Sequence, residues 1–479
     1  MNAFFRKFSP WILLPCLVSI LVWDFHQINT EFLGGDASQN LRSALNFLHH
    51  GIYSEAPLGN SVLPGYRREP APNFLLSIYL AVLAKFIPSF DYQGFPVDPM
   101  LVMMSKWINL GYAAALLCSV WALMRRLIDP SAAADILSLP LFYYVNDFFI
   151  VSQLNNLNTE LPAALFLVWV SLSFILARQS SRWFWMLISG LCLGLLVLTK
   201  ASGAYIGLIA IPILILCLSR SQKFKNLLQI FALFSLGFLL TVMPWIVRNY
   251  SEFERPVVAQ GAGDVLLIRS VFNTMNDQEF AHSFYAYAPK FIRDKALGPW
   301  TGLSQDDLEC GEALDRFNRN LACDKKALEE NRYDDVRSFY QIGKRALPRS
   351  LNLTREQKQP EAVRRILADP KRHITVSLPM AWRGLWSFGQ QNSLAAILFN
   401  SMAYMALFAA PILAVVQRRF IWIYLSLVPV GYFLFYATFS HFLPRYSELL
   451  IPMAMICLIL MIVDCFSRLF PSAGLKLRF

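Results

Sequence analysis

Long apolar stretches separated by short polar loops constrain this chain more than any other feature of its sequence. Several of them exceed the roughly 18–20 residues that an α-helix needs to cross a bilayer. Of the 479 residues, 56% are hydrophobic and only 16% are charged, so a water-soluble globule of this size would expose too much apolar surface. The sequence therefore predicts an all-α, polytopic membrane protein.

Ten membrane-spanning helices are expected, together with one shorter apolar helix. The expected spans are roughly 10–30, 102–124, 132–151, 160–177, 183–200, 203–219, 226–247, 394–416, 420–440 and 446–466. The first resembles a signal peptide, but no small-residue cleavage site follows it, so we interpret it as an uncleaved helix. The apolar segment 73–88 is too short for a full crossing and is expected to be an interfacial helix.

Short basic runs follow alternate apolar segments. They are Arg6/Lys7, Arg125/Arg126, Arg178/Arg182, Arg220/Lys223/Lys225, Arg418/Arg419 and Arg468/Lys476/Arg478. The positive-inside rule places these runs, and with them both termini, in the cytoplasm. The net charge of +11 is then explained by contacts with the anionic lipid bilayer, and nucleic acid is not an expected partner. We expect a bacterial inner membrane, with the opposite face toward the periplasm or exterior.

The chain is expected to have three parts. They are an N-terminal transmembrane module (1–247) that contains the first outer loop (24–72), a mainly helical extracytoplasmic domain (248–388), and C-terminal transmembrane helices (389–479). In the outer domain, Cys310 and Cys323 form either a disulfide, as an oxidising compartment allows, or two free thiols. No glycine-rich phosphate loop and no alternation of strands and helices indicates a nucleotide-binding domain.

Charged residues at the outer ends of the expected helices are the candidates for chemistry. They are Asp36, Glu69, Glu160, Lys200, Arg248, His441, Arg445 and Glu448. Charges at membrane depth are costly, and they usually line a cavity or a substrate path. Asp36 follows two glycines and precedes a helical pattern over 37–50. It is therefore either a general base held at the bilayer surface or a helix N-cap.

The order of these motifs resembles the GT-C superfamily of membrane glycosyltransferases, especially the group of protein O-mannosyltransferases and lipid A aminoarabinose transferases. The matching residues are Asp36, Ala44, Leu45, Gly51 and Tyr53, then Arg67, Arg68, Glu69 and Pro70, then NTE at 158–160, LTK at 198–200, PWIVRNY at 244–250 and HFLPRYSELLIP at 441–452. The resemblance implies a helical bundle with interfacial helices and a small outer domain. Ala37 stands where many relatives carry a second acid, so a protein acceptor is not singled out.

The resemblance also implies an activity, namely transfer of a sugar from a polyprenyl-phosphate carrier to an acceptor hydroxyl on a lipid, glycan or protein. In that interpretation Asp36 is the base, while Glu160 orients the acceptor or pairs with Arg248. Lys200 and Arg445 stabilise the phosphate leaving group. The further substrate contacts are Arg67, Arg68, Tyr446 and Arg248.

Each of these residues also has a structural alternative. Glu160 suits a first helical turn, Lys200 a snorkelling helix end, and Arg248 and Arg445 interfacial anchors. Glu69 and His441 either hold a divalent metal ion, the one cofactor considered, or serve structure, Glu69 through ion pairs with the neighbouring arginines.

A transporter or flippase for a lipid-linked or anionic substrate is the alternative function, and a non-catalytic scaffold is a third. A transporter predicts charges near the bilayer midplane and helices broken in the middle, whereas the charges here gather at helix ends. A scaffold does not account for carboxylates and cations on one face. A nucleotide-sugar donor would require a cytoplasmic α/β domain, for which the cytoplasmic loops are too short.

Overall fold

The computed structural model describes residues 3–31, 33–57, 63–65, 70–87, 98–180, 182–219, 224–387 and 393–478. The regular structure of these residues is helical apart from one two-stranded ladder. The chain divides into two compact units. Unit 1 comprises Met1–Ala259, Met402–Gly431 and Leu449–Phe479, and unit 2 comprises Gln260–Ser401 and Tyr432–Glu448.

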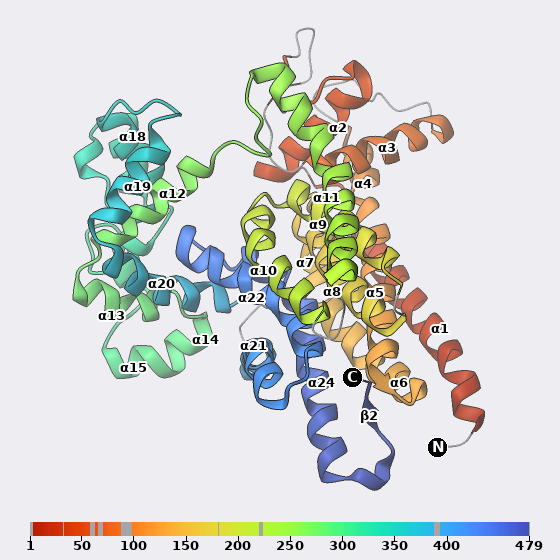
Figure 1. The fold of residues 1–479 in the computed structure, drawn as a ribbon. Helices are drawn as coiled ribbons and strands as arrows, with labels where there is room; N and C mark the ends of the chain where they lie inside the picture. The colour runs from red at the N-terminus through yellow and green to blue at the C-terminus, as the bar shows by residue number, and fades with distance from the viewer. Residues whose placement is uncertain are drawn as a thin grey trace. The chain divides into compact units, whose positions relative to one another are not determined.

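Unit 1 consists mainly of long apolar helices (Figure 1). They are α1 (Ala3–Gln27), α2 (Gly35–His50), α3 (Pro70–Phe86), α4 (Pro99–Lys106), α5 (Ile108–Leu127), α6 (Ser131–Val145), the π-helical turn η1 (Asn146–Ile150), α7 (Val151–Leu154), α8 (Glu160–Ser180), α9 (Phe184–Thr199), α10 (Ser202–Ser219), α11 (Phe224–Phe253) and α24 (Ile451–Leu469), followed by η8 (Pro471–Ala473). Two further helices are divided between the units, α21 (Leu394–Gln417) and α22 (Ile421–Phe439).

The helices that can span a membrane match the expected ones. Within the described residues, seven helical stretches are long and apolar enough to cross a bilayer, and four shorter helices are also apolar. The ten expected spans coincide with the seven long stretches and with α1, α9 and α10, while the expected interfacial segment coincides with α3. The prediction of an all-α, polytopic membrane protein is therefore confirmed.

Burial differs sharply among these helices. Almost every side chain of α8 is buried, because α8 packs against α5, α9 and α24. Helix α10, by contrast, exposes Leu208 and Ile209, and α11 exposes Leu240 and Val247. Such large exposed apolar side chains are expected where lipid, rather than water, surrounds a helical bundle.

Small residues bring α9 and α11 into close contact. A methyl group added at Gly190 would lie 2.0 Å from the carbonyl oxygen of Phe234, and one at Gly237 would lie 2.2 Å from that of Leu187. Gly194 is equally crowded by Thr241. The helix pair therefore has backbones in van der Waals contact, a packing that glycines allow in membranes, where association depends on close approach.

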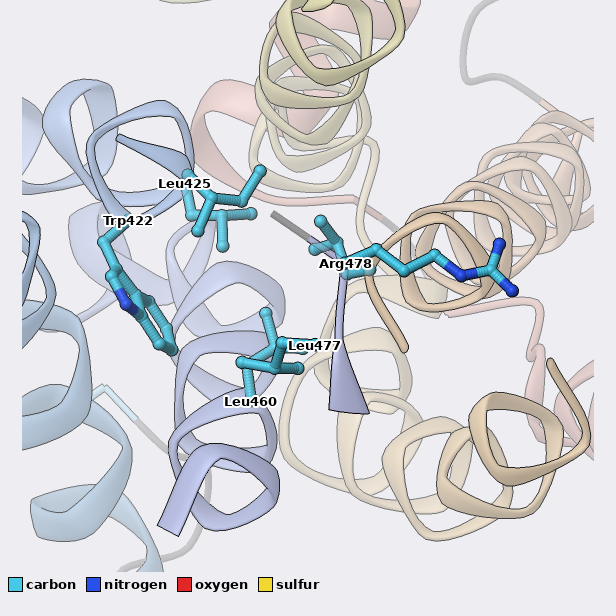
Figure 2. A pocket seen from close by; sticks show the side chains of 7 residues that line it. Trp422, Leu425, Leu460, Leu477 and Arg478 are labelled. Carbon is cyan, nitrogen blue, oxygen red and sulfur yellow. The ribbon is translucent and has the colours of Figure 1, made fainter. Parts of the chain in front are cut away.

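The short two-stranded ladder at one end of unit 1 contains Asp129 and holds Arg478, one of the basic residues that the sequence assigns to the cytoplasm. Strand β1 (Ile128–Asp129) pairs antiparallel with β2 (Lys476–Leu477), and the guanidinium of Arg478 contacts Asp129 at 2.7 Å. Figure 2 shows Leu477 beside Leu460, while the guanidinium of Arg478 points away from both. This ladder and the beginning of α1 lie at the end opposite α2 and α3 (Figure 1).

Unit 2 consists of short helices and turns. They are α12 (Ala262–Val271), η2 (Phe272–Thr274), α13 (Asp277–Ala286), α14 (Lys290–Ile292), η3 (Arg293–Leu297), α15 (Gly298–Thr301), η4 (Asp306–Leu308), η5 (Asp315–Phe317), α16 (Ala322–Glu329), η6 (Tyr333–Asp335), α17 (Phe339–Gln341), η7 (Ile342–Ala346), α18 (Leu347–Ser350), α19 (Lys358–Ala368), α20 (Pro370–Leu385) and α23 (Arg445–Glu448). Its length and polar sequence agree with a small helical domain.

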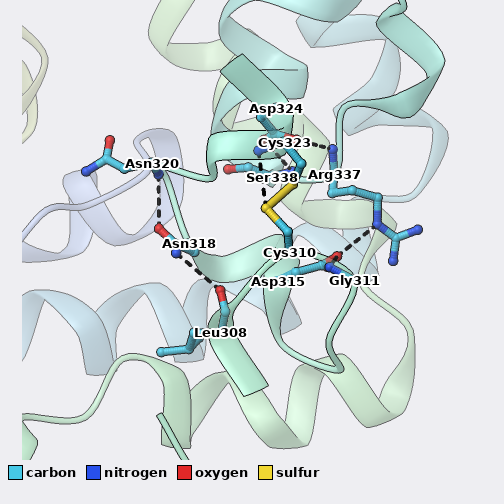
Figure 3. Close-up of a disulfide and its surroundings, with 10 residues drawn as sticks. All are labelled: Leu308, Cys310, Gly311, Asp315, Asn318, Asn320, Cys323, Asp324, Arg337 and Ser338. Carbon is cyan, nitrogen blue, oxygen red and sulfur yellow. Dashed lines mark hydrogen bonds and ion pairs between the residues drawn. A yellow bond between two sulfur atoms is a disulfide. The ribbon is translucent and has the colours of Figure 1, made fainter. Parts of the chain in front are cut away.

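A disulfide joins Cys310 to Cys323 in this unit (Figure 3). The structure thus has the bonded alternative rather than two free thiols. Beside it, the carboxylate of Asp324 accepts hydrogen bonds from the backbone N–H groups of Arg337, at 2.7 Å, and Ser338, at 3.0 Å. Because the helices here are short, these covalent and polar links supply much of the order that a larger apolar core would give.

Candidate functional site

Asp36 lies in the first turn of α2, at the end of unit 1 opposite the β1–β2 ladder (Figure 1). The N-cap of α2 is Gly34, and Gly35 has a φ of +53°, a conformation that residues with a Cβ adopt rarely. Asp36 is therefore not the N-cap, which was its structural alternative. The side chain of Asp36 is exposed, whereas the next residue, Ala37, lies on the buried side of α2.

Asparagine side chains hold the start of α2 against the loop before α8. The backbone N–H of Asn29 donates to Oδ1 of Asn155 at 2.9 Å, and Nδ2 of Asn155 donates to the carbonyl of Gln27 at 2.8 Å. From α2 itself, Nδ2 of Asn40 donates to the carbonyl of Leu157 at 2.6 Å. The first turns of α2 and α8, which carry Asp36 and Glu160, therefore belong to one hydrogen-bonded region.

Lys106 is a buried cation in the same region. Its side chain is 1% exposed, and its Nζ donates to the carbonyls of Asn29 and Glu31, both at 3.0 Å, and to Oδ1 of Asn29 at 2.8 Å. The ammonium thus fixes the loop that leads into α2. Our sequence reasoning missed Lys106, although a lysine inside the apolar run PMLVMMSKWINL is a signal that could have identified it.

Glu160 and Lys200 form a buried ion pair. Glu160 opens α8, and Lys200 is the C-cap of α9. Lys200 Nζ lies 3.0 Å from Oε1 of Glu160, and both side chains are almost fully buried. The structure therefore brings together two of the predicted site residues, and it gives Glu160 a partner other than Arg248.

Arg248 instead binds the polypeptide that follows α2. Its guanidinium donates to the carbonyls of Tyr53, at 3.1 Å, and Gly65, at 2.9 Å. The rings of Tyr53, Trp245 and Phe253 surround it, with centroids 4.9–5.8 Å from Cζ. These contacts make Arg248 a clamp on the backbone at Tyr53 and Gly65, because its N–H groups are directed at their carbonyl oxygens.

Three predicted residues, Arg67, Arg68 and Glu69, lie outside the described residues. The substrate contacts of the two arginines and the metal-binding role of Glu69 therefore stay predictions. Within the part of the chain that the structure describes, no three His, Cys, Asp or Glu side chains are grouped as a metal site.

His441, Arg445 and Tyr446 lie together in unit 2. The Tyr446 hydroxyl is 3.4 Å from Nε2 of His441, and Cζ of Arg445 is 5.6 Å from the centroid of the Tyr446 ring. His441 is buried. Burial, reinforced by nearby cations of which Arg383 and Arg319 act most strongly, lowers the pKa of His441 well below its usual range. His441 is consequently uncharged at neutral pH.

A second buried charge in unit 1 also escaped the sequence reasoning. Asp24, near the end of α1, is fully buried and accepts a hydrogen bond from Nδ2 of Asn146 at 3.0 Å. Asn146 begins the π-helical turn η1, and such turns are frequent where a helix serves a function. The available signal in the sequence was an aspartate directly after the apolar run that ends at Trp23.

The family model of dolichyl-phosphate-mannose-protein mannosyltransferases matches residues 108–247, a segment that contains Glu160 and Lys200. No curated protein sequence matches the chain.

Among solved structures, the archaeal oligosaccharyltransferase AglB from Archaeoglobus fulgidus, in complex with an inhibitory peptide and a dolichol-phosphate, is similar over 98% of this chain and 52% of its own, with 14% identity and a TM-score of 0.53. The apo form of the Archaeoglobus fulgidus oligosaccharyltransferase is similar over 99% and 52%, with 14% identity and a TM-score of 0.54. ArnT from Cupriavidus metallidurans is similar over 97% of this chain and 80% of its own, with 12% identity. Its TM-score of 0.39 is too low to support the fold.

The chain therefore has the fold of the GT-C superfamily of membrane glycosyltransferases, as its motif order implied, and it is an integral, multi-pass membrane protein. Within that superfamily, the segment that matches a family model is similar to the dolichyl-phosphate-mannose-protein mannosyltransferases. The chain spans about half the length of the archaeal oligosaccharyltransferase.

Proposed function

We propose that the chain is a membrane glycosyltransferase that moves a sugar from a polyprenyl-phosphate carrier to an acceptor hydroxyl. One observation carries the proposal: on a GT-C fold, an exposed carboxylate, Asp36, and a buried carboxylate–ammonium pair, Glu160–Lys200, occur in one hydrogen-bonded region of unit 1. The archaeal oligosaccharyltransferase that shares the fold was solved with a dolichol-phosphate, which supports a lipid phosphate as the carrier.

The chemistry requires a base and a cation. In this mechanism Asp36 accepts the proton of the acceptor hydroxyl, whose oxygen attacks the anomeric carbon as the bond from that carbon to the phosphate oxygen breaks. The departing phosphate gains negative charge, and Lys200 or Arg445 stabilises it. Glu160 holds the ammonium of Lys200 in place through their contact at 3.0 Å. Attack opposite to the leaving group gives inversion at the anomeric carbon.

Other residues position this machinery. Lys106 and Asn155 hold the loop before α2, and Arg248 holds the backbone at Tyr53 and Gly65. We propose Arg67, Arg68 and Tyr446 as further substrate contacts, and Glu69 with His441 as the ligands of any divalent metal. The site then faces the outer leaflet, at the end of unit 1 opposite the basic residues.

The test is sugar transfer from radiolabelled polyprenyl-phosphate donors to membrane acceptors, comparing the wild type with Asp36→Asn. Loss of a general base typically reduces rate by about 10²–10⁴-fold, and binding of the lipid donor should persist. Glu252→Gln is the matched control, since Glu252 is an exposed carboxylate on α11 of the same unit. Transfer by Asp36→Asn at the wild-type rate would remove Asp36 as the base, and Glu160 would be tested next.

A further inference from the structure

Three cations in unit 2 form a group that the proposed reaction does not use. We name this group the basic cluster. It consists of Arg319, which follows η5, Lys344, which lies in η7, and Arg383, which lies in α20. Arg319 and Lys344 both contact Tyr340: Cζ of Arg319 is 3.9 Å from the ring centroid, and Lys344 Nζ donates to the hydroxyl at 3.0 Å.

Arg383 joins the cluster through His441. Nη1 of Arg383 donates to the carbonyl of His441 at 3.2 Å, and the His441 ring centroid is 5.2 Å from that of Tyr340. Arg383 Cζ also lies 4.6 Å from the ring centroid of Tyr287. The three cations are therefore arranged around one continuous set of aromatic rings.

Among the described residues, the three cations of the basic cluster have no acidic partner, unlike many basic residues of unit 2. Several basic residues of this unit pair with carboxylates, namely Arg316–Glu279, Arg332–Glu330, Arg337–Asp315, Lys358–Asp264, Arg364–Glu361, Arg365–Glu361 and Arg372–Asp277. In the part of the chain that the structure describes, none of the three cluster cations pairs with a carboxylate. Within the described residues, the positive charge of the cluster is consequently not compensated by a carboxylate.

Buried hydrogen-bond donors accompany this charge. Nε of Arg319 and the hydroxyl of Tyr287 are both buried and make no hydrogen bond. Grouped like charges and unsatisfied donors cost free energy in the unliganded protein, and a bound anion would relieve both.

We propose that the basic cluster is a binding site for a phosphate-class oxyanion, either soluble or on a lipid headgroup. The guanidinium groups of Arg319 and Arg383 present planar N–H pairs that suit phosphate oxygens. Lys344 is exposed and adds an ammonium at the surface. The rings of His441 and Tyr340, with centroids 5.2 Å apart, lie beside the cations and limit their access to water, which strengthens the attraction.

Direct binding tests the proposal without relying on sugar transfer. The full-length protein in neutral-lipid nanodiscs is dialysed against labelled inorganic pyrophosphate in one arm. In the other arm, the nanodiscs contain phosphatidic acid, whose headgroup is a phosphate monoester. Arg319→Gln/Lys344→Gln should raise the Kd roughly tenfold or more in the arm that binds. Arg332→Gln/Arg364→Gln removes the same charge from exposed, paired positions of unit 2 and should leave the Kd unchanged.

A measurement on the wild type guards against misfolding of the variant. Pyrophosphate or phosphatidic acid should slow acylation of Lys344 by an amine-reactive reagent several-fold, while Lys325 and Lys326, which are exposed on α16, keep their rates. Binding in either arm with protection of Lys344 supports the site and identifies the carrier of the phosphate. Absence of binding in both arms, equal affinities of the two double variants, or equal labelling of all three lysines would overturn it.

Discussion

The buried Glu160–Lys200 pair makes a quantitative prediction about stability. The two charged atoms lie 3.0 Å apart, and their side chains are only 3% and 8% exposed. Lys200→Met leaves the Glu160 carboxylate without this ammonium, and removing one partner of a buried pair costs about 3–5 kcal/mol. Glu160→Gln should cost a similar amount. Replacing both residues removes both charges, so the double variant should recover most of the loss.

The assay is a double-mutant cycle on thermal unfolding of the purified protein in one detergent. The coupling free energy between the two positions should exceed about 2 kcal/mol, because residues in one ion pair are not additive. Additive losses, with coupling below roughly 0.5 kcal/mol, would refute the pair as an interaction that stabilises unit 1.

The same variants separate a structural role from a binding role. If Lys200 also contacts the donor phosphate, the double variant should be folded and stable yet bind the polyprenyl-phosphate donor weakly. Full donor binding by the double variant would confine Lys200 to structure and leave Arg445 as the cation for the phosphate.

Three further predictions concern packing, the disulfide and pH. Gly237→Ala should destabilise the protein by about 1–3 kcal/mol or more in thermal unfolding, because its methyl would overlap a backbone oxygen. Gly111→Ala, where nothing lies within 4 Å, should not. Reduction of Cys310–Cys323, 13 residues apart, should lower the stability of unit 2 by about 3 kcal/mol, measured by unfolding with and without reductant. Burial and Arg269 lower the pKa of His373 from 6.5 to about 4. As the pH decreases from 6.5 to 4, the free energy of unfolding should therefore decrease by up to about 1.4 kcal/mol per pH unit, measured by denaturant unfolding.

Each of these has an outcome that would contradict it. Equal stability of the two alanine variants would mean that the α9–α11 contact is looser than the structure shows. Unchanged unfolding in reductant would mean that the disulfide constrains neither state. For His373 the sign follows from proton binding: between pH 6.5 and 4 the unfolded chain binds the proton more tightly. His373→Gln should flatten this dependence, and an identical slope in that variant would refute the assignment.

The bilayer made most of the fold predictable from sequence. A spanning helix must satisfy its backbone internally and present apolar side chains to lipid, so runs of about 20 residues identify helices without knowledge of their partners. The ends were predictable for the same reason. Glu160 opens α8 and Lys200 follows α9, because charged residues mark the points where the chain leaves the apolar environment.

Partner choice could not be predicted in this way. Glu160 pairs with Lys200 rather than Arg248, and neither spacing nor hydropathy distinguishes two cations at helix ends. Of the two roles predicted for Asp36, that of N-cap was wrong, because α2 begins at Gly35 with Gly34 as its N-cap. The basic cluster was invisible because its residues come from separate segments of unit 2 and meet only in the folded domain.

The side chains that hold the site together were missed because they look unremarkable in sequence, yet they follow from the same physics as the spans. Irregular backbone near membrane depth needs hydrogen-bond partners that lipid cannot supply. Asn109 donates to the carbonyls of Gln153, Leu154 and Asn156 within 3.1 Å, and Lys106 does the same for the loop before α2. Polar residues inside an apolar run therefore point to places where the chain departs from helix, and Asp36 and Glu160 follow such places, in the first turns of α2 and α8.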